Sequence, residues 1–238
     1  MRRWLVLSIL LNVAMLCAAL GLVIHKGGWP WLVGLTRTMP SSGFSQAGLY
    51  QGRVDSFMKM PVQKGVWVFL GDSLTDYAPT QELFGVRALN RGIAGDTLSD
   101  LGKRASEVSR HLPDAIVLWG GTNDILAGTG CEEVVQRILK LATTLNQSSP
   151  TSRLIVLGPP PISDLLASSQ AGLRSGIVCV NRRLGERISE VKAQFADPAV
   201  VLADGSGALS AAYSFDGIHL SGDGYRAWAA WLSPMLAD

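Results

Sequence analysis

Short apolar runs alternate with longer amphipathic segments along the chain after residue 65. The short runs are bounded by Gly, Pro, Asn and Asp, a pattern typical of buried strands. The longer segments repeat apolar residues at helical spacing. We therefore expect strands at 66–70, 87–89, 115–119, 154–157 and 200–202, and helices at 97–109, 132–145, 178–195 and 222–232.

This alternation predicts the fold class. Parallel neighbouring strands need crossover connections, and right-handed crossovers place helices on both faces of the sheet. We expect an α/β domain with a parallel sheet of about five strands between two layers of helices. In sheets of this kind the reactive groups lie beyond the carboxyl ends of the strands.

The start of the chain has a different pattern, because residues 4–24 contain no ionisable side chain. This length is close to the ~20 residues that cross a bilayer core. Arg2 and Arg3 precede the run and Lys26 follows it, which weakly favours an internal N-terminus. We predict an uncleaved membrane signal anchor at 1–28 with the folded domain on the outer (periplasmic or extracellular) side. The alternatives are a cleaved signal peptide, which would make the protein secreted, and a buried core helix.

A linker is predicted between the anchor and the folded domain. Residues 29–64 carry Gly, Pro, Ser and Gln without a sustained period, and one short helix is expected near 50–60. The remaining residues, 65–238, have the length of one ordinary domain.

Charge and cysteine content narrow the function classes. The 238-residue chain has 21 basic and 19 acidic residues, and no basic run interleaves with aromatics, so we expect no nucleic-acid surface. Three cysteines are too few for a disulfide framework, although Cys131 and Cys179 could pair outside the cytoplasm. His25, His111 and His219 lie far apart without metal-ligand spacing, so we predict no metal. Nothing in the sequence indicates an oligomeric state.

Three polar motifs follow the first three predicted strands. The first places Ser73 at a strand end, where a nucleophile would be exposed, although an isolated Gly-Asp-Ser is more often a helix cap. The second contains glycines that let the backbone present an N–H to a ligand, with Asp96 or Thr97 as a helix cap. The third contains Asn123, whose uncharged amide suits a transient oxyanion. The motifs are 71–76 (Gly-Asp-Ser-Leu-Thr-Asp), 90–97 (Asn-Arg-Gly-Ile-Ala-Gly-Asp-Thr) and 120–124 (Gly-Gly-Thr-Asn-Asp).

A fourth motif, Phe215-Asp216-Gly217-Ile218-His219, precedes the last predicted helix. Its spacing lets Asp216 orient His219 while the other ring nitrogen faces Ser73. Taken singly, each motif fits an ordinary loop or a solvated side chain. All four occur in chain order at predicted strand ends or helix starts, which favours a catalytic interpretation.

With these motifs the chain resembles the SGNH (GDSL-type) hydrolase superfamily over residues 66–231. The 90–97 stretch also looks like the platelet-activating-factor acetylhydrolase-like and thioesterase/lysophospholipase branches. The resemblance implies a three-layer α/β/α sandwich of flavodoxin-like type. It further implies Ser73 as nucleophile, His219 as base and Asp216 as orienter. The implied oxyanion hole consists of the Ser73 N–H, the Gly95 N–H, chosen over that of Gly92, and the Asn123 side chain.

We therefore expect a serine ester hydrolase that needs no cofactor and acts on short-acyl esters such as acetyl. The substrate is a small-molecule, glycan or lipid ester, and acetylated glycans, lysophospholipids, thioesters and short lipid esters all remain open. The alternatives are an acyltransferase to sugar hydroxyls that uses the same site, and a catalytically silent binding or anchoring module.

The segment 158–176, with three prolines at its start, is predicted to be the longest loop at the reactive edge. A shallow, open site follows from this expectation, because no other connection is long enough to form a lid. Trp119, Tyr77, Phe215 and Ile218 are candidates for lining it, with core packing as the alternative for each.

Overall fold

In the part of the chain that the structure describes, five parallel strands form one sheet, in the order β2-β1-β3-β4-β5. The computed structural model describes residues 46–237, together with Trp4, Asn12, Met15, Cys17, Ala18, Gly21 and His25. The strands are β1 (Trp67–Gly71), β2 (Ala88–Gly92), β3 (Ala115–Trp119), β4 (Arg153–Leu157) and β5 (Gln194–Ala196). This is the strand order of flavodoxin-like folds, and it places β1 next to β3 at the point where the order reverses.

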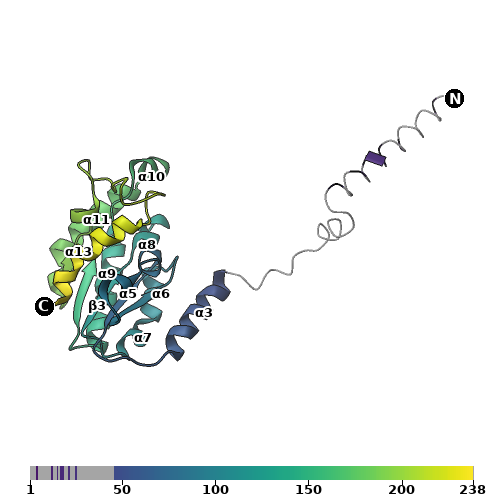
Figure 1. Cartoon of the computed structure of the whole chain (residues 1–238). Helices are drawn as coiled ribbons and strands as arrows, with labels where there is room; N and C mark the ends of the chain where they lie inside the picture. The colour runs from purple at the N-terminus through teal and green to yellow at the C-terminus, as the bar shows by residue number, and fades with distance from the viewer. Residues whose placement is uncertain are drawn as a thin grey trace. The chain divides into compact units, whose positions relative to one another are not determined.

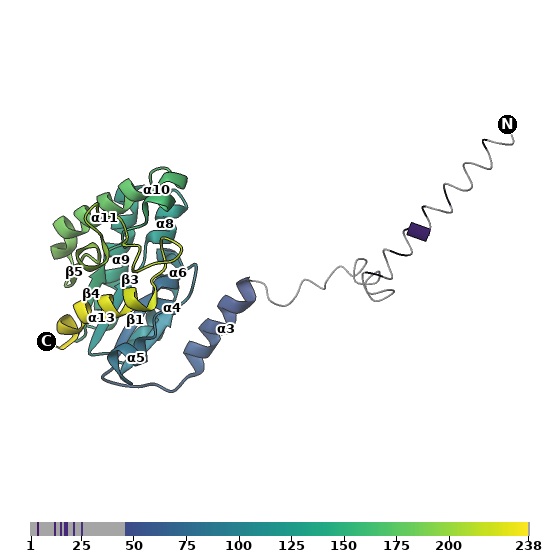
Figure 2. The ribbon, with the colours of Figure 1, turned by 45° about the horizontal axis from the view of Figure 1, so that its top comes forward.

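Helices cover both faces of the sheet, which confirms the predicted three-layer arrangement (Figure 1). The first face carries α6 (Leu98–Lys103), α7 (Ala105–Ser109), α9 (Cys131–Ser148) and α11 (Leu173–Arg187), and the second carries α5 (Thr80–Phe84), α12 (Ala199–Leu202) and α13 (Gly222–Ala237). Figure 2 shows α13 lying across the second face. Within residues 46–237 the remaining helices are α3 (Gln46–Lys59), α4 (Ser73–Asp76), α8 (Thr122–Leu126), α10 (Asp164–Ser169) and the 3₁₀ helix η1 (Ile188–Glu190).

The two layers follow from the period of two in each strand. Val68 and Leu70 point into the core under α6, α7, α9 and α11, whereas Phe69 between them points to the opposite core. There Phe69 stacks on Phe84 of α5 and meets Trp228 of α13 edge to face. Because both faces of a strand are buried, its sequence reads as a continuous apolar run, which is why the central strands were predictable.

The predicted fifth strand is wrong. Residues 200–202 form the end of α12, and the fifth strand lies earlier, at β5, which overlaps the end of the segment predicted as helix 178–195. Pro198 precedes α12 and the Asp197 side chain accepts from the Ala199 N–H, so the β-branched run is held in a helical turn. The short edge strand β5 exposes Gln194 and half-buries Phe195, so it lacks the apolar run of a buried strand.

Two other predicted segments are divided differently in the structure. The predicted helix 97–109 is broken at Arg104 into α6 and α7. The predicted loop 158–176 contains α10 and the first turn of α11, and its proline-rich start is buried rather than exposed. Ser163 caps α10 by accepting from the Leu166 N–H, which is a local helix signal.

By its internal contacts the chain divides into two units, Met1–Gly52 and Arg53–Asp238. Among the described residues, no helix combines the length and apolar character required of a membrane span. Most of the predicted anchor at 1–28 and the first part of the predicted linker fall outside the described residues, so the anchor stays a prediction. The last part of the predicted linker, from Arg53 on, belongs to the second unit, where Phe57 of α3 is buried.

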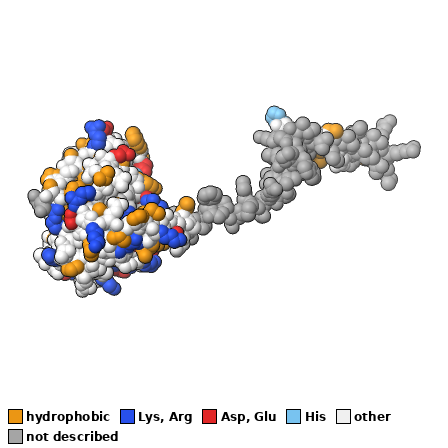
Figure 3. Space-filling view, turned by 60° about the horizontal axis from the view of Figure 1, so that its bottom comes forward, with side chains coloured by type: hydrophobic (Ala, Val, Ile, Leu, Met, Phe, Trp, Pro, Cys, Tyr) orange, Lys and Arg blue, Asp and Glu red, His pale blue; other side chains and the backbone are white. Residues whose placement is uncertain are grey.

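A disulfide joins the start of α9 to α11, between Cys131 and Cys179. The sequence left this pairing open, because residues 48 positions apart carry no local signal of contact. On the surface, Figure 3 shows Lys and Arg side chains interspersed with apolar ones over one face of the second unit.

Candidate active site

The four predicted motifs meet at the carboxyl edge of the sheet. Ser73 is the first residue of α4, two positions after β1 ends, and Gly95 and Asn123 follow β2 and β3 in the same way. Since β1 lies between β2 and β3 and all three strands are parallel, these residues share one edge. His219 reaches the same edge from the segment just before α13.

Ser73, His219 and Asp216 form a continuous hydrogen-bonded chain. The Ser73 Oγ lies 2.9 Å from His219 Nε2, and His219 Nδ1 lies 2.6 Å from Asp216 Oδ2. The two contacts use different ring nitrogens, which is the arrangement in which a carboxylate orients an imidazole toward a hydroxyl. The structure therefore brings together the three residues that the sequence named.

The turn that carries Asp216 and His219 is held by its own backbone. Asp216 Oδ1 accepts from the N–H groups of Ile218 and His219, at 3.0 and 2.8 Å. Gly217 has φ of +87°, and a Cβ there would lie 2.2 Å from Ser163 Oγ, so only glycine fits this position. The Ser163 N–H donates to the Gly217 carbonyl, which ties the turn to the segment after β4.

Asp216 is the anionic member of the chain. Partial burial acts to raise its pKa, but hydrogen bonds from the His219 ring and from the Ile218 and His219 N–H groups outweigh burial and lower the pKa to about 2. A carboxylate that is ionised at neutral pH can only accept, so it holds the proton of His219 on Nδ1. His219 Nε2 is then free to accept the proton of the Ser73 hydroxyl.

Three N–H donors follow β1, β2 and β3 at the same edge of the sheet. Gly95 sits in an exposed turn with φ of +87°, and Asn123 Nδ2 donates to the Asp96 carbonyl at 2.8 Å, which leaves the second amide hydrogen available. Within residues 46–237 neither the Ser73 N–H nor the Gly95 N–H has an acceptor. Gly92, in contrast, is buried at the end of β2, where a Cβ would lie 2.1 Å from the Asp76 nitrogen.

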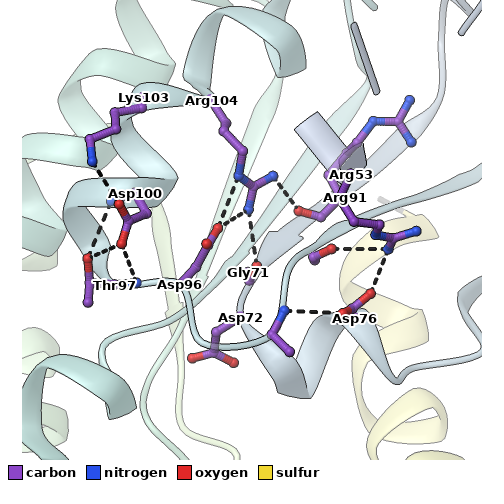
Figure 4. Close-up of polar contacts among 12 residues, drawn as sticks. Arg53, Gly71, Asp72, Asp76, Arg91, Asp96, Thr97, Asp100, Lys103 and Arg104 are labelled. Carbon is purple, nitrogen blue, oxygen red and sulfur yellow. Dashed lines mark hydrogen bonds and ion pairs between the residues drawn. The ribbon is translucent and has the colours of Figure 1, made fainter. Parts of the chain in front are cut away.

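A buried ion pair lies behind the Gly95 turn, and the sequence analysis missed it. Arg104 is 3% exposed and donates to Asp96 Oδ2 from Nε and Nη2, at 3.0 and 2.5 Å (Figure 4). Its other N–H groups reach the carbonyls of Arg91 and Gly71, at the ends of β2 and β1. Asp96 was considered only as a helix cap, a role that Thr97 fills through a capping box with Asp100. The sequence signal for this ion pair was the position of Arg104, a charged residue in the middle of the otherwise apolar face of the predicted helix 97–109.

Asp72, next to the nucleophile position, is also buried. Its Oδ1 accepts from the Leu74 N–H at 3.0 Å, while its Oδ2 has no hydrogen-bond partner in the structure. Burial raises the pKa of Asp72 to about 7; the Leu74 hydrogen bond opposes this rise and the nearby Asp96 carboxylate adds to it. The folded protein therefore holds a proton on Asp72 at a pH where the unfolded chain does not.

This proton predicts a pH-dependent effect of Asp72→Asn. The wild-type carboxyl keeps its proton when folded and loses it when unfolded between about pH 4 and pH 7, so it lowers stability as pH rises through that range. The amide has no such titration. The free energy of unfolding of Asp72→Asn relative to wild type should therefore increase from about pH 5 to about pH 8, by up to ~3 kcal/mol.

Urea unfolding at both pH values measures this difference, with Asp223→Asn on the exposed surface of α13 as the matched control. The same Asp72→Asn difference at both pH values would show that Asp72 is ionised in the folded protein throughout.

The aromatic and apolar candidates for lining the site divide between core and surface. Trp119 is buried and stacks on Trp228, so it belongs to the core. Ile218 is partly buried and packs against the core under α6, α7, α9 and α11. Tyr77 is half-exposed with its ring 5.2 Å from that of His219, and Phe215 is 97% exposed.

The site itself is open. A cavity of about 270 Å³ lies beside α11 and is lined by Ile162, Ile177 and Val178 among others, but neither Ser73 nor His219 lines it. The side chains of His219 and Asp216 are 33% and 54% exposed. A small ester carbonyl can reach Ser73 from solvent without the movement of a lid.

This architecture has known relatives. The sequence profile of the GDSL-like Lipase/Acylhydrolase family matches residues 69–227. The platelet-activating factor acetylhydrolase IB subunit alpha2 of Homo sapiens is 33% identical over 168 residues, which cover 66% of this chain and 70% of that protein. The alpha1 subunit of Homo sapiens is 32% identical over 189 residues, which cover 72% of this chain and 77% of that protein.

Solved structures of other proteins share this fold. One from Streptococcus pneumonia, described as a platelet activating factor, has a TM-score of 0.68 at 26% identity and covers 87% of this chain and 99% of that one. An acetylxylan esterase from Geobacillus stearothermophilus, solved as a catalytic mutant, shares the fold with a TM-score of 0.57 at 22% identity, over 73% of this chain and 95% of that one. The chain therefore belongs to the GDSL-like lipase/acylhydrolase family and is a carboxylic ester hydrolase of the SGNH superfamily.

Proposed function

We propose that the enzyme cleaves short-acyl esters, with acetyl preferred, through a covalent intermediate on Ser73. The observation that carries the mechanism is the chain of contacts from Ser73 Oγ through both nitrogens of His219 to Asp216. A hydroxyl is a weak nucleophile at its ordinary pKa, and an adjacent base that is itself oriented by a carboxylate activates it.

In the first step His219 Nε2 takes the proton from Ser73 Oγ as the oxygen attacks the ester carbonyl carbon. The carbonyl oxygen becomes an oxyanion, which accepts from the Ser73 and Gly95 N–H groups and the Asn123 amide. Asp216 stabilises the imidazolium that forms. The tetrahedral intermediate collapses, and the alcohol leaves with the proton from His219.

In the second step water replaces the alcohol. His219 takes a proton from water as its oxygen attacks the acyl-Ser73 carbonyl, and the same three donors hold the second oxyanion. Collapse returns the proton to Ser73 Oγ and releases the carboxylic acid. The protein's own side chains and backbone supply every group that these steps use.

Two observations support a short acyl group. The candidate site is open, with His219 and Asp216 partly exposed, and the cavity beside α11 is lined by neither Ser73 nor His219, so that cavity does not hold an acyl chain bound to the nucleophile. The names of related proteins point the same way, since they include platelet-activating factor acetylhydrolases, an acetylxylan esterase and a carbohydrate acetylesterase.

The test is kcat/KM across p-nitrophenyl esters from acetyl through butyryl and octanoyl to palmitoyl. We expect acetyl to exceed octanoyl by about tenfold or more, because a methylene that finds no apolar pocket gains no transition-state binding. The Ser73→Ala protein supplies the background rate for each ester. An optimum at decanoyl or longer would reject the short-acyl proposal and indicate a lipase or lysophospholipase.

A further inference from the structure

The second half of α3 contacts the carboxyl edge of the sheet, although it precedes the region that matches the family. The family match begins at residue 69, whereas Arg53 lies on α3. Arg53 Nη2 donates to Asp76 Oδ1 at 2.6 Å and to the Gly92 carbonyl at 3.2 Å (Figure 4). A residue of the predicted linker thus bonds to α4 and to the end of β2.

These contacts extend to the turn that presents Gly95. The second oxygen of Asp76 accepts from the Ala94 N–H at 3.1 Å, one residue before Gly95. Arg53 and Asp76 together therefore hold the turn at Gly92 and at Ala94. On its inner side the same turn is held at Asp96 by Arg104.

Gly95 itself has little else to fix it. It is exposed, has a positive φ, and a Cβ built on it would meet nothing within 4 Å. The direction of its N–H therefore depends on how residues 92–94 and 96 are held. An oxyanion donor is effective only when it is aimed at the developing charge before the reaction starts.

Phe57 of α3 contacts arginines on both sides of the Gly95 turn. Its ring is buried and lies 4.8 Å from the guanidinium carbons of both Arg53 and Arg91, and 5.9 Å from that of Arg104. Each distance is within the range of a cation–π contact. One aromatic side chain of α3 thus contacts an arginine on either side of the Gly95 turn.

We propose that Arg53 is a positioning residue for the Gly95 oxyanion donor, so that the segment before β1 is part of the active-site machinery. This proposal rests on the hydrolytic mechanism given above. The Arg53–Asp76 pair is partly exposed, at 44% and 21% of the two side chains, and pairs of this kind stabilise folded proteins little. Loss of Arg53 should therefore change the rate far more than the stability.

The test compares Arg53→Ala with Arg110→Ala in the full-length protein. Arg110 holds the same segment by donating to the carbonyls of Met58 and Met60, and it is therefore the matched control. For Arg53→Ala we expect kcat on p-nitrophenyl acetate to fall about tenfold, a part of the ~10²–10³ that loss of a whole donor costs, with KM and Tm nearly unchanged. Arg110→Ala should keep the wild-type kcat.

Two further variants test whether Arg53 acts on the Gly95 turn through Asp76. Arg53→Lys should regain most of the rate, because both contacts come from one nitrogen and an ammonium can donate to both acceptors. Asp76→Ala should slow the reaction as well, and the double variant should be no slower than the slower single variant if both residues act through Ala94.

A wild-type kcat for Arg53→Ala would overturn the proposal, as would equal losses of kcat in Arg53→Ala and Arg110→Ala. Ser73→Ala separates this failure from failure of the mechanism. If Ser73→Ala is inactive while Arg53→Ala is fully active, only the positioning role is wrong. If Ser73→Ala retains wild-type activity, the mechanism itself is wrong.

Discussion

Replacing Ser73 with alanine should lower kcat/KM on acetyl esters by about 10⁴-fold or more, since it removes the hydroxyl that lies 2.9 Å from His219 Nε2. The remaining donors would still bind an oxyanion, so a small residual rate above that of water is expected. The measurement is the initial rate of p-nitrophenyl acetate hydrolysis, together with labelling by a serine-reactive phosphonate.

Ser99→Ala, an exposed serine of α6, is the matched control and should keep both turnover and labelling. Stoichiometric labelling of the Ser73→Ala protein at its active site would mean that another residue is the nucleophile.

Replacing Asn123 with alanine should lower kcat by about 10²–10³-fold with a smaller change in KM, because the amide donates to charge that develops only in the transition state. Phosphonate labelling should continue, at a reduced rate, since Ser73 and His219 remain. This combination of slow turnover and retained labelling distinguishes loss of a donor from loss of the nucleophile.

Asn146→Ala is the control for this variant, because Asn146 lies near the end of α9, outside the motifs at the strand ends. A Asn123→Ala protein with wild-type kcat would remove Asn123 from the oxyanion hole. Its bond to the Asp96 carbonyl would then be its only role.

The local chemistry of the site was predictable because each component follows a strand. Ser73, Gly95 and Asn123 lie just beyond β1, β2 and β3, and parallel strands bring their carboxyl ends to one edge whatever the length of the crossovers. Asp216 and His219 are three residues apart, and their contact is local in sequence. The roles of all five residues remain proposals, and the variants above directly test those of Ser73 and Asn123.

The groups that support the site were not predictable in the same way. Arg104 bonds to Gly71, 33 positions away, and Arg53 to Gly92, 39 positions away, and neither spacing has a period that marks contact. Asp72 appeared in the sequence only as part of a motif. Its raised pKa arises from burial, which depends on everything packed around it.

The class of fold and the first four strands follow from the sequence pattern. The central strands β1, β3 and β4 are the clearest, because a strand buried on both faces is apolar on both, as Val68, Phe69 and Leu70 are. The pattern did not predict the fifth strand, the break at Arg104, the pairing of Cys131 with Cys179 or the place of Arg53 beside the Gly95 turn. Periodicity reports how a segment is buried, whereas these features depend on which distant segments meet, and that is settled when the helices pack on the sheet.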